Sequence, residues 1–201
     1  TIGDVEATPL LCAGAVGYRA LELCELRNGQ RLGLTGFGAS GHLVLQMARH
    51  RFPDSTISVF ARSETEQSFA RELGAEWAGG TTAQPPQPLD AIIDTTPAWL
   101  PVLSALQSLG PGGRLVINAI RKEAGDREIL TELDYDRHLW REKSVRSVAN
   151  VTRHDVRECL ALAASIPLQP SVSEYALKDA NRALIDLRKG HIRGAKVLRI
   201  G

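Results

Sequence analysis

Short apolar or β-branched runs alternate with segments of helical spacing along the chain as far as residue 165. Runs of this kind predict strands, and apolar residues three and four positions apart predict amphipathic helices. The expected strands are 31–36, 55–61, 90–95, 112–120 and 144–150. The expected helices are 10–26, 40–50, 63–73, 97–110, 135–143 and 153–165. This alternation predicts an α/β fold with a doubly wound parallel sheet that helices cover on both faces.

The last stretch of the chain departs from this alternation. Residues 167–176 are extended and interrupted by prolines, 177–190 have the pattern of an amphipathic helix, and 195–201 predict a terminal strand. We therefore expect a helical region at 1–27, an α/β domain at 28–166 and a C-terminal tail at 167–201 that belongs to a second subdomain.

Three glycines at GxGxxG spacing lie between a predicted strand and a predicted helix, in the stretch LTGFGASGHL (34–43). In a Rossmann unit the first glycine permits a tight turn, the second lets the backbone approach a pyrophosphate, and the third lets the helix pack against the strand. Spacing alone also fits a turn that only packs, but the strand, turn and helix together favour a dinucleotide cofactor held at the helix N-terminus. The expected contacts are Gly36, Phe37, Gly38, Ala39, Ser40, Gly41 and His42.

The end of the second predicted strand indicates which dinucleotide is preferred. An acidic residue that binds the ribose 2′-hydroxyl is expected there, but this chain has Ala61 and Arg62, followed by Ser63. Ser63 and Glu66 have the spacing of a capping box for the next helix. Because a guanidinium pairs well with a 2′-phosphate, we expect NADP to be favoured over NAD. The alternative is that Arg62 is a solvated loop residue and another group holds the ribose.

Residues at the ends of the later strands are further candidates for cofactor contacts, because ligands of open α/β sheets bind at the carboxyl ends of the strands. These candidates are Thr95, Thr96, Asn118, Ala119 and Val148 to Asn150. The alternative for each is ordinary loop chemistry.

Composition narrows the class of partner. The 24 lysines and arginines nearly balance the 23 aspartates and glutamates, which gives a net charge of +1. Such a charge does not create a broad positive potential that would attract nucleic acid or an anionic membrane. Apolar runs fall short of the roughly 20 residues that cross a bilayer. Three separated cysteines argue against a disulfide framework and for a reducing compartment. We expect a cytoplasmic protein whose partners are small molecules.

Three stretches resemble the zinc-dependent alcohol dehydrogenases of the medium-chain dehydrogenase/reductase superfamily. They are PLLCAGAVGYRAL (9–21), GFGASGHLVLQMAR (36–49) and LDYDRHLWREKSVRSVANVTRHDVREC (133–159). The resemblance implies hydride transfer between a nicotinamide cofactor and an alcohol or aldehyde. It also implies an interdomain helix region at 1–27, an NAD(P)-binding Rossmann domain at 28–166, and a tail at 167–201 that returns to a GroES-like catalytic domain, most of which is missing here. Pairing of cofactor domains through the strand at 144–150 would give a homodimer or tetramer.

The same resemblance gives Cys12 a role. In the resembling enzymes the cysteine of the LLCAG segment binds the catalytic zinc, together with a Cys and a His from the N-terminal domain. Cys24 and Cys159 are expected in the core, and the five histidines show no ligand spacing with Cys12: His42, His50, His138, His154 and His191. Because one ligand cannot hold a catalytic zinc, we expect this chain alone to bind cofactor without oxidising alcohols.

The segment before the last predicted strand departs from the family pattern. Related chains often carry an arginine there that reaches the cofactor pyrophosphate, where this sequence has Ala195. Arg193 or Lys196 could substitute, although surface basic residues are more often merely solvated.

Three other functions fit parts of the pattern. A zinc-free quinone or enone reductase of the same superfamily is one, although Cys12 argues against it. A non-catalytic nucleotide-binding or dimerisation module is another, and a start of the native protein at Thr1 would favour it. An S-adenosylmethionine methyltransferase also has a glycine-rich first turn, but that fold usually has an acid where Ala61 stands.

Overall fold

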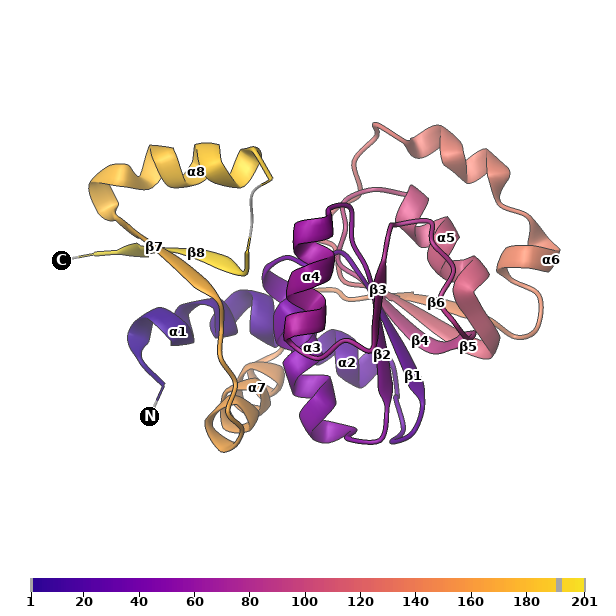
Figure 1. The fold of residues 1–201 in the computed structure, drawn as a ribbon, viewed down its shortest axis with the longest axis horizontal. Helices are drawn as coiled ribbons and strands as arrows, with labels where there is room; N and C mark the ends of the chain where they lie inside the picture. Colours follow the sequence, from indigo (N-terminus) through magenta and orange to yellow (C-terminus); the bar gives the residue numbers. More distant parts are fainter. Residues whose placement is uncertain (1, 191–192, 201) are drawn as a thin grey trace.

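A six-stranded parallel sheet forms the centre of the molecule in the computed structural model, which describes residues 2–190 and 193–200 (Figure 1). Its strands are β1 (Arg31–Thr35), β2 (Thr56–Phe60), β3 (Trp77–Gly79), β4 (Leu89–Asp94), β5 (Leu109–Ile117) and β6 (Ser144–Ser147). They lie in the order β3-β2-β1-β4-β5-β6, and every neighbouring pair is parallel. This is the strand order of doubly wound dinucleotide-binding folds, so the predicted fold class is confirmed.

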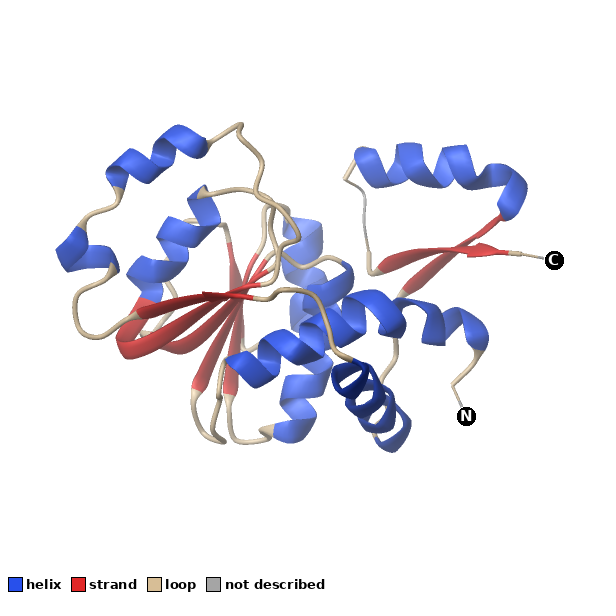
Figure 2. Ribbon diagram, turned by 180° about the vertical axis from the view of Figure 1, so that it is seen from behind, coloured by secondary structure: helices blue, strands red, loops and turns tan. Residues whose placement is uncertain are grey.

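Helices cover both faces of this sheet (Figures 1 and 2). The α-helices of the first part are α1 (Asp4–Pro9), α2 (Ala15–Leu23), α3 (Ala39–Arg51), α4 (Glu64–Glu72), α5 (Leu100–Ser108), α6 (Tyr135–His138) and α7 (Arg153–Ser165). A π-helical turn, η1 (Leu10–Gly14), joins α1 to α2, and a 3-10 helix, η2 (Arg127–Glu132), precedes α6. Apolar side chains of α2, α3, α4 and α7 form one core with the sheet, and those of α5 form the other.

The central strands are apolar on both faces, as a doubly covered sheet requires. In β4, Ala91 and Ile93 belong to the core shared with α3, whereas Ile92 belongs to the core shared with α5. Leu89 also reaches the α5 side, because the strand register shifts between Leu89 and Ala91. Successive side chains of a strand point to opposite faces, so one run of apolar residues fills both layers.

Two of the described helices, α4 and α7, begin with a capping box. The Ser63 hydroxyl accepts from the Glu66 N–H at 3.2 Å and the Glu66 carboxylate accepts from the Ser63 N–H, which confirms the predicted capping box of α4. Thr152 and Asp155 make the same exchange at the start of α7.

Several elements differ from the sequence expectation, and β5 and β6 end at Ile117 and Ser147, each three residues before the predicted strand end. β3 was not predicted, because its three residues include alanine and glycine and it is a strand through its pairing with β2. The predicted helix at 97–110 is shorter, since β5 begins at Leu109. The predicted helix at 135–143 ends at His138, and Arg141 and Glu142 have φ of 72° and 60°, outside the helical region. The helix expected at 10–26 begins as η1, becomes α-helical at Ala15 and ends at Leu23.

The tail forms a separate two-stranded sheet, as its departure from the alternation suggested. β7 (Val172–Ala176) and β8 (Ala195–Arg199) pair in parallel, joined by η3 (Leu177–Asp179) and α8 (Ala180–Arg188). Figure 1 shows this sheet beside α1, away from the six-stranded sheet. His191 lies outside the described residues. In the parts of the chain that the structure describes, no helix is long and apolar enough to cross a membrane.

Candidate functional site

The residues that follow the strands are held in a row along the carboxyl edge of the sheet. Each donates its backbone N–H to a carbonyl of a neighbouring strand, which extends the parallel ladder by one residue. These bonds join Gly36 to Phe60 (2.8 Å), Ala61 to Gly79 (2.9 Å), Thr95 to Thr35 (2.9 Å), Asn118 to Asp94 (2.7 Å) and Val148 to Ile117 (2.9 Å). The edge therefore presents a fixed line of residues on both sides of the β1–β4 boundary, the switch point of the strand order.

The three glycines of the turn after β1 are glycine for different physical reasons. Gly36 has φ of 80°, and a Cβ there would lie 2.7 Å from Thr95 Oγ1. A Cβ on Gly41 would lie 2.6 Å from the carbonyl oxygen of Gly36, so this glycine lets α3 approach β1. A Cβ on Gly38 would meet no described atom within 4 Å. Packing thus requires glycine at the first and third positions, whereas the second opens onto free space.

That free space belongs to a cavity of about 540 Å³ at the carboxyl edge. Most of the predicted cofactor contacts line it: Gly36, Phe37, Gly38, Ala39, Ser40, Ala61, Arg62, Thr95, Thr96 and Asn118. Sequence reasoning missed several polar lining residues, which lie on α4 or on loops beyond the strand ends: Glu66, Thr81, Glu123 and Asp126.

The other predicted contacts lie outside the wall of the cavity that the described residues form. Gly41 packs against the turn, and Ser63 caps α4. Ala119, Val148 and Asn150 follow β5 and β6 and do not line the cavity, and Asn150 has φ of 65°.

His42 is buried beneath the turn and joins it to the tail. Its Nε2 accepts from the Ser171 N–H at 3.1 Å, so Nδ1 carries the proton and donates to Gly38 O at 3.0 Å. Burial lowers the pKa of His42, against the opposite effect of its hydrogen bonds to Gly38 and Ala39. The neutral ring therefore acts as a structural bridge, not as a group that faces the cavity.

Arg62 lines the cavity and lies two residues after Phe60, the last residue of β2. Its side chain is exposed, and in the described part of the molecule it forms no ion pair. The nearby Glu66 carboxylate accepts from both the N–H and the hydroxyl of Ser63, at 3.2 and 3.0 Å. The guanidinium is thus available to an anion at this end of the cavity.

A buried ion pair lies below the opposite end. Asp94, the last residue of β4, is fully buried and accepts from Thr35 Oγ1 at 2.5 Å and Thr96 Oγ1 at 2.7 Å. Lys122 Nζ pairs with its other oxygen and donates to the carbonyls of Thr96 and Ala98, both at 2.8 Å. This pair fixes the segment after β5 against the end of β4.

Asp126 ties the same segment to α5. Its carboxylate accepts from the N–H groups of Trp99 and Leu100, each at 2.8 Å. The bond from Leu100 is the largest cause of the lowered pKa of Asp126. The carboxylate thereby caps α5 and holds the cavity wall that contains Glu123.

Two of the three cysteines lie in the core, as expected. Cys24 and Cys159 are buried, and burial raises the pKa of Cys24 to about 12 and that of Cys159 to about 11. Cys12 is exposed on η1. Across 2–190 and 193–200, no three His, Cys, Asp or Glu side chains are grouped so that they could hold a metal ion. The described residues therefore do not form a zinc site by themselves.

The basic residues of the tail lie away from the cavity wall. The Arg193 guanidinium lies 4.3 Å from the ring centroid of Phe69 and pairs with Glu72, and Lys196 donates to the Tyr175 hydroxyl at 3.1 Å.

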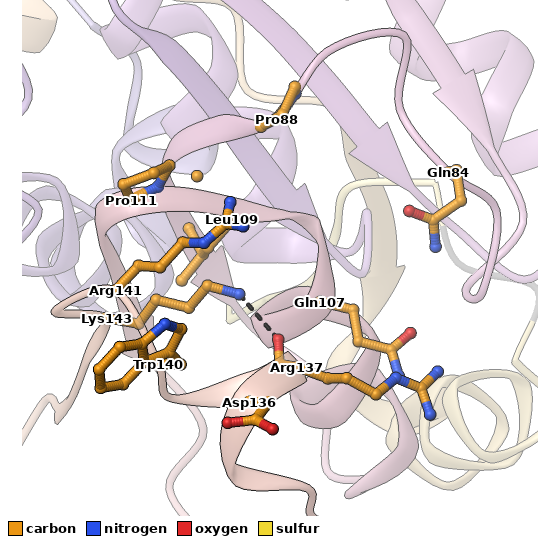
Figure 3. A pocket seen from close by; sticks show the side chains of 11 residues that line it. Gln84, Pro88, Gln107, Leu109, Pro111, Asp136, Arg137, Trp140, Arg141 and Lys143 are labelled. Carbon is orange, nitrogen blue, oxygen red and sulfur yellow. Dashed lines mark hydrogen bonds between the residues drawn. The ribbon is translucent and has the colours of Figure 1, made fainter.

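A second cavity, of about 510 Å³, opens at the amino ends of β5 and β6 (Figure 3). Arg137, Trp140, Arg141 and Lys143 contribute to its wall. The Lys143 ammonium is already engaged, since it donates to the carbonyls of Leu106 at 2.7 Å and Arg137 at 2.9 Å. Ligands of open α/β sheets bind at the other edge, so the cavity at the glycine turn is the better candidate.

Comparison with known proteins finds curated relatives and many structures of similar fold. The chain is 42% identical over 197 residues to the probable alcohol dehydrogenase AdhA of Mycobacterium tuberculosis, an alignment that covers 98% of this chain and 55% of that protein. No protein-family model matches the chain.

Two solved structures illustrate the similarity of fold. The acetophenone reductase of Geotrichum candidum in complex with NAD superposes with a TM-score of 0.80 at 20% identity, over 98% of this chain and 56% of that one. The CAD of Helicobacter pylori complexed with NADP(H) gives 0.79 at 24% identity, over 96% and 54%. The chain spans about half the length of the proteins that it matches.

Proposed function

We propose that this chain, which belongs to the alcohol dehydrogenases of the medium-chain dehydrogenase/reductase superfamily, supplies a binding site for a nicotinamide dinucleotide. The observation that carries the proposal is the turn between β1 and α3. Its first and third glycines are demanded by packing, whereas Gly38 leaves open the space into which a side chain would otherwise point.

The turn suits a pyrophosphate in charge as well as in shape. It leads into α3, a helix of 13 residues whose first N–H groups carry the positive end of the helix dipole. Backbone N–H groups in this position bind phosphates, and a residue without a side chain lets them come close.

We propose further that NADP is preferred over NAD. Arg62 stands at the end of β2, where a carboxylate would bind the ribose 2′-hydroxyl, and Glu66 is engaged by Ser63. A guanidinium there can pair with a 2′-phosphate. The relatives support either choice, since one solved structure contains NAD and the other NADP(H).

In the complete enzyme the reaction would move a hydride between an alcohol carbon and the nicotinamide ring, which is the chemistry that the cofactor supplies when bound. This chain would bind and orient the dinucleotide. We propose Cys12 as one thiolate ligand of a zinc site in the longer protein. Because the described residues offer no further ligands beside it, we assign no zinc-dependent step to this chain and expect it to be inactive alone.

The free cysteines and the exposed edge strand support proposals about partners and location. We propose small-molecule partners, namely the dinucleotide and an alcohol or aldehyde. The free cysteines fit a reducing compartment such as the cytoplasm. Edge strand β6 is exposed over its four residues, so a second copy could pair there to give a dimer or tetramer.

Titration with NADPH tests the proposal, with a matched pair of glycine substitutions. Gly38→Ala should weaken binding at least about tenfold, because the methyl group occupies phosphate space. Gly110→Ala is the control, since its Cβ would make an ordinary 3.4 Å contact at the other edge of the sheet. Equal affinities of the two variants, or no NADPH binding by the wild type, would contradict the proposal.

A further inference from the structure

Asn118 lines the cavity and carries a buried amide that is unpaired among the described residues. It directly follows β5, its N–H donates to Asp94 O at 2.7 Å, and only 7% of the residue is exposed. Within residues 2–190 and 193–200, neither its side-chain oxygen nor its side-chain nitrogen has a hydrogen-bond partner. Burying an amide without partners is unfavourable, so an apolar side chain of similar size would suit these surroundings better.

Three neighbouring side chains at this end are already paired. Thr95 Oγ1 donates to Thr35 O at 2.9 Å, and Thr96 Oγ1 donates to Asp94. Lys122 is held by Asp94 and two carbonyls. Unlike these side chains, the amide of Asn118 can still give one hydrogen bond and accept another.

The strand order says which part of a dinucleotide lies near Asn118. Arg62 follows β2, the glycine turn follows β1 and Asn118 follows β5, so Arg62 and Asn118 lie on opposite sides of the turn. This step rests on the proposed function. If the pyrophosphate lies at the turn and the 2′-phosphate at Arg62, the nicotinamide half extends toward β4 and β5.

We infer that the Asn118 side chain is a specificity-determining group that pairs with the carboxamide of the nicotinamide ring. A carboxamide offers one acceptor and one donor side by side, which complements the two unpaired atoms of Asn118. A ribose hydroxyl is the competing partner, and the test separates the two.

The test compares three ligands on the wild type and on Asn118→Leu by calorimetry. They are NADP⁺, its 3-acetylpyridine analogue, in which a methyl group replaces the carboxamide NH₂, and 2′-phospho-ADP-ribose, which lacks the ring. Wild type should prefer the carboxamide form over the acetyl form by about 3- to 10-fold, as one net hydrogen bond gives. Asn118→Leu should bind both ring forms equally and leave the affinity for 2′-phospho-ADP-ribose unchanged.

Stability of the ligand-free chain provides a second measurement. Because Asn118→Leu removes a buried unpaired amide, it should raise the thermal midpoint, and Asn118→Ala supplies the ligand comparison if the leucine variant does not fold. Discrimination that persists in both variants would overturn the inference, and an equal loss for both ring forms would assign the amide to the ribose instead. Failure of the wild type to bind even 2′-phospho-ADP-ribose would overturn the proposed function itself.

Discussion

Lys122 holds the segment after β5 in place, and replacing it should destabilise the chain far more than replacing a surface cation. The Lys122 side chain is 9% exposed and that of Asp94 is 0% exposed. Lys122→Met leaves a buried carboxylate without its cation and removes the donor that serves the carbonyls of Thr96 and Ala98. Breaking a buried pair costs about 3–5 kcal/mol.

The lower end of that range applies here, because Asp94 keeps its hydrogen bonds from Thr35 and Thr96. A loss of about 3 kcal/mol in a chain of this size lowers the thermal midpoint by about 6–12 °C. Arg146→Met is the matched control, since its pair with Glu25 is more than half exposed on both sides and should contribute less than about 1 kcal/mol.

Urea and thermal unfolding followed by circular dichroism would measure these differences. Asp94→Asn added to Lys122→Met should recover part of the loss, because it removes the uncompensated charge. The reasoning would be refuted if Lys122→Met behaved like the surface control, or if the losses from the two substitutions simply added.

Three further predictions concern cofactor choice, pH and metal. Wild type should bind NADPH about 5- to 30-fold more tightly than NADH, and Arg62→Ala should remove most of this preference; equal wild-type affinities would contradict it. Because the folded pKa of His42 lies below its ordinary value of 6.5, the unfolded chain binds more protons just below that pH. The unfolding free energy should therefore fall from pH 7.5 to 5.5, less so in His42→Gln, and equal slopes would argue against this assignment. The purified chain should hold fewer than about one zinc per ten chains by elemental analysis, since Cys12 stands alone; stoichiometric zinc would reveal ligands that we have missed.

Local sequence signals were sufficient for much of the fold. The helix at 153–165 has the predicted bounds, and Ser63 caps α4 as expected, because periodicity and capping depend on residues close in the chain. β3 depends instead on its pairing with β2, and its own three residues carry no strand pattern. The left-handed backbone at Arg141 and Glu142 likewise gave no signal in the sequence.

The candidate site divides in the same way. The glycine turn and Arg62 could be predicted from the sequence, because the features that identify them lie within a few adjacent residues. The ion pair of Asp94 with Lys122 joins residues 28 positions apart and could be found only in three dimensions. The sequence identified Asn118 as a candidate cofactor contact. It could not show that the amide is unpaired, because that depends on the residues that surround it in the fold.

The most direct test of the central claim is to map where NADPH binds by NMR. Titration of the ¹⁵N-labelled chain with NADPH should shift the amide signals of residues 36–41 most strongly, with further shifts at Arg62 and Asn118. Residues 137–143, which border the second cavity, should stay unchanged. Shifts confined to 137–143, or an unchanged spectrum at millimolar NADPH, would contradict a dinucleotide site at the glycine turn.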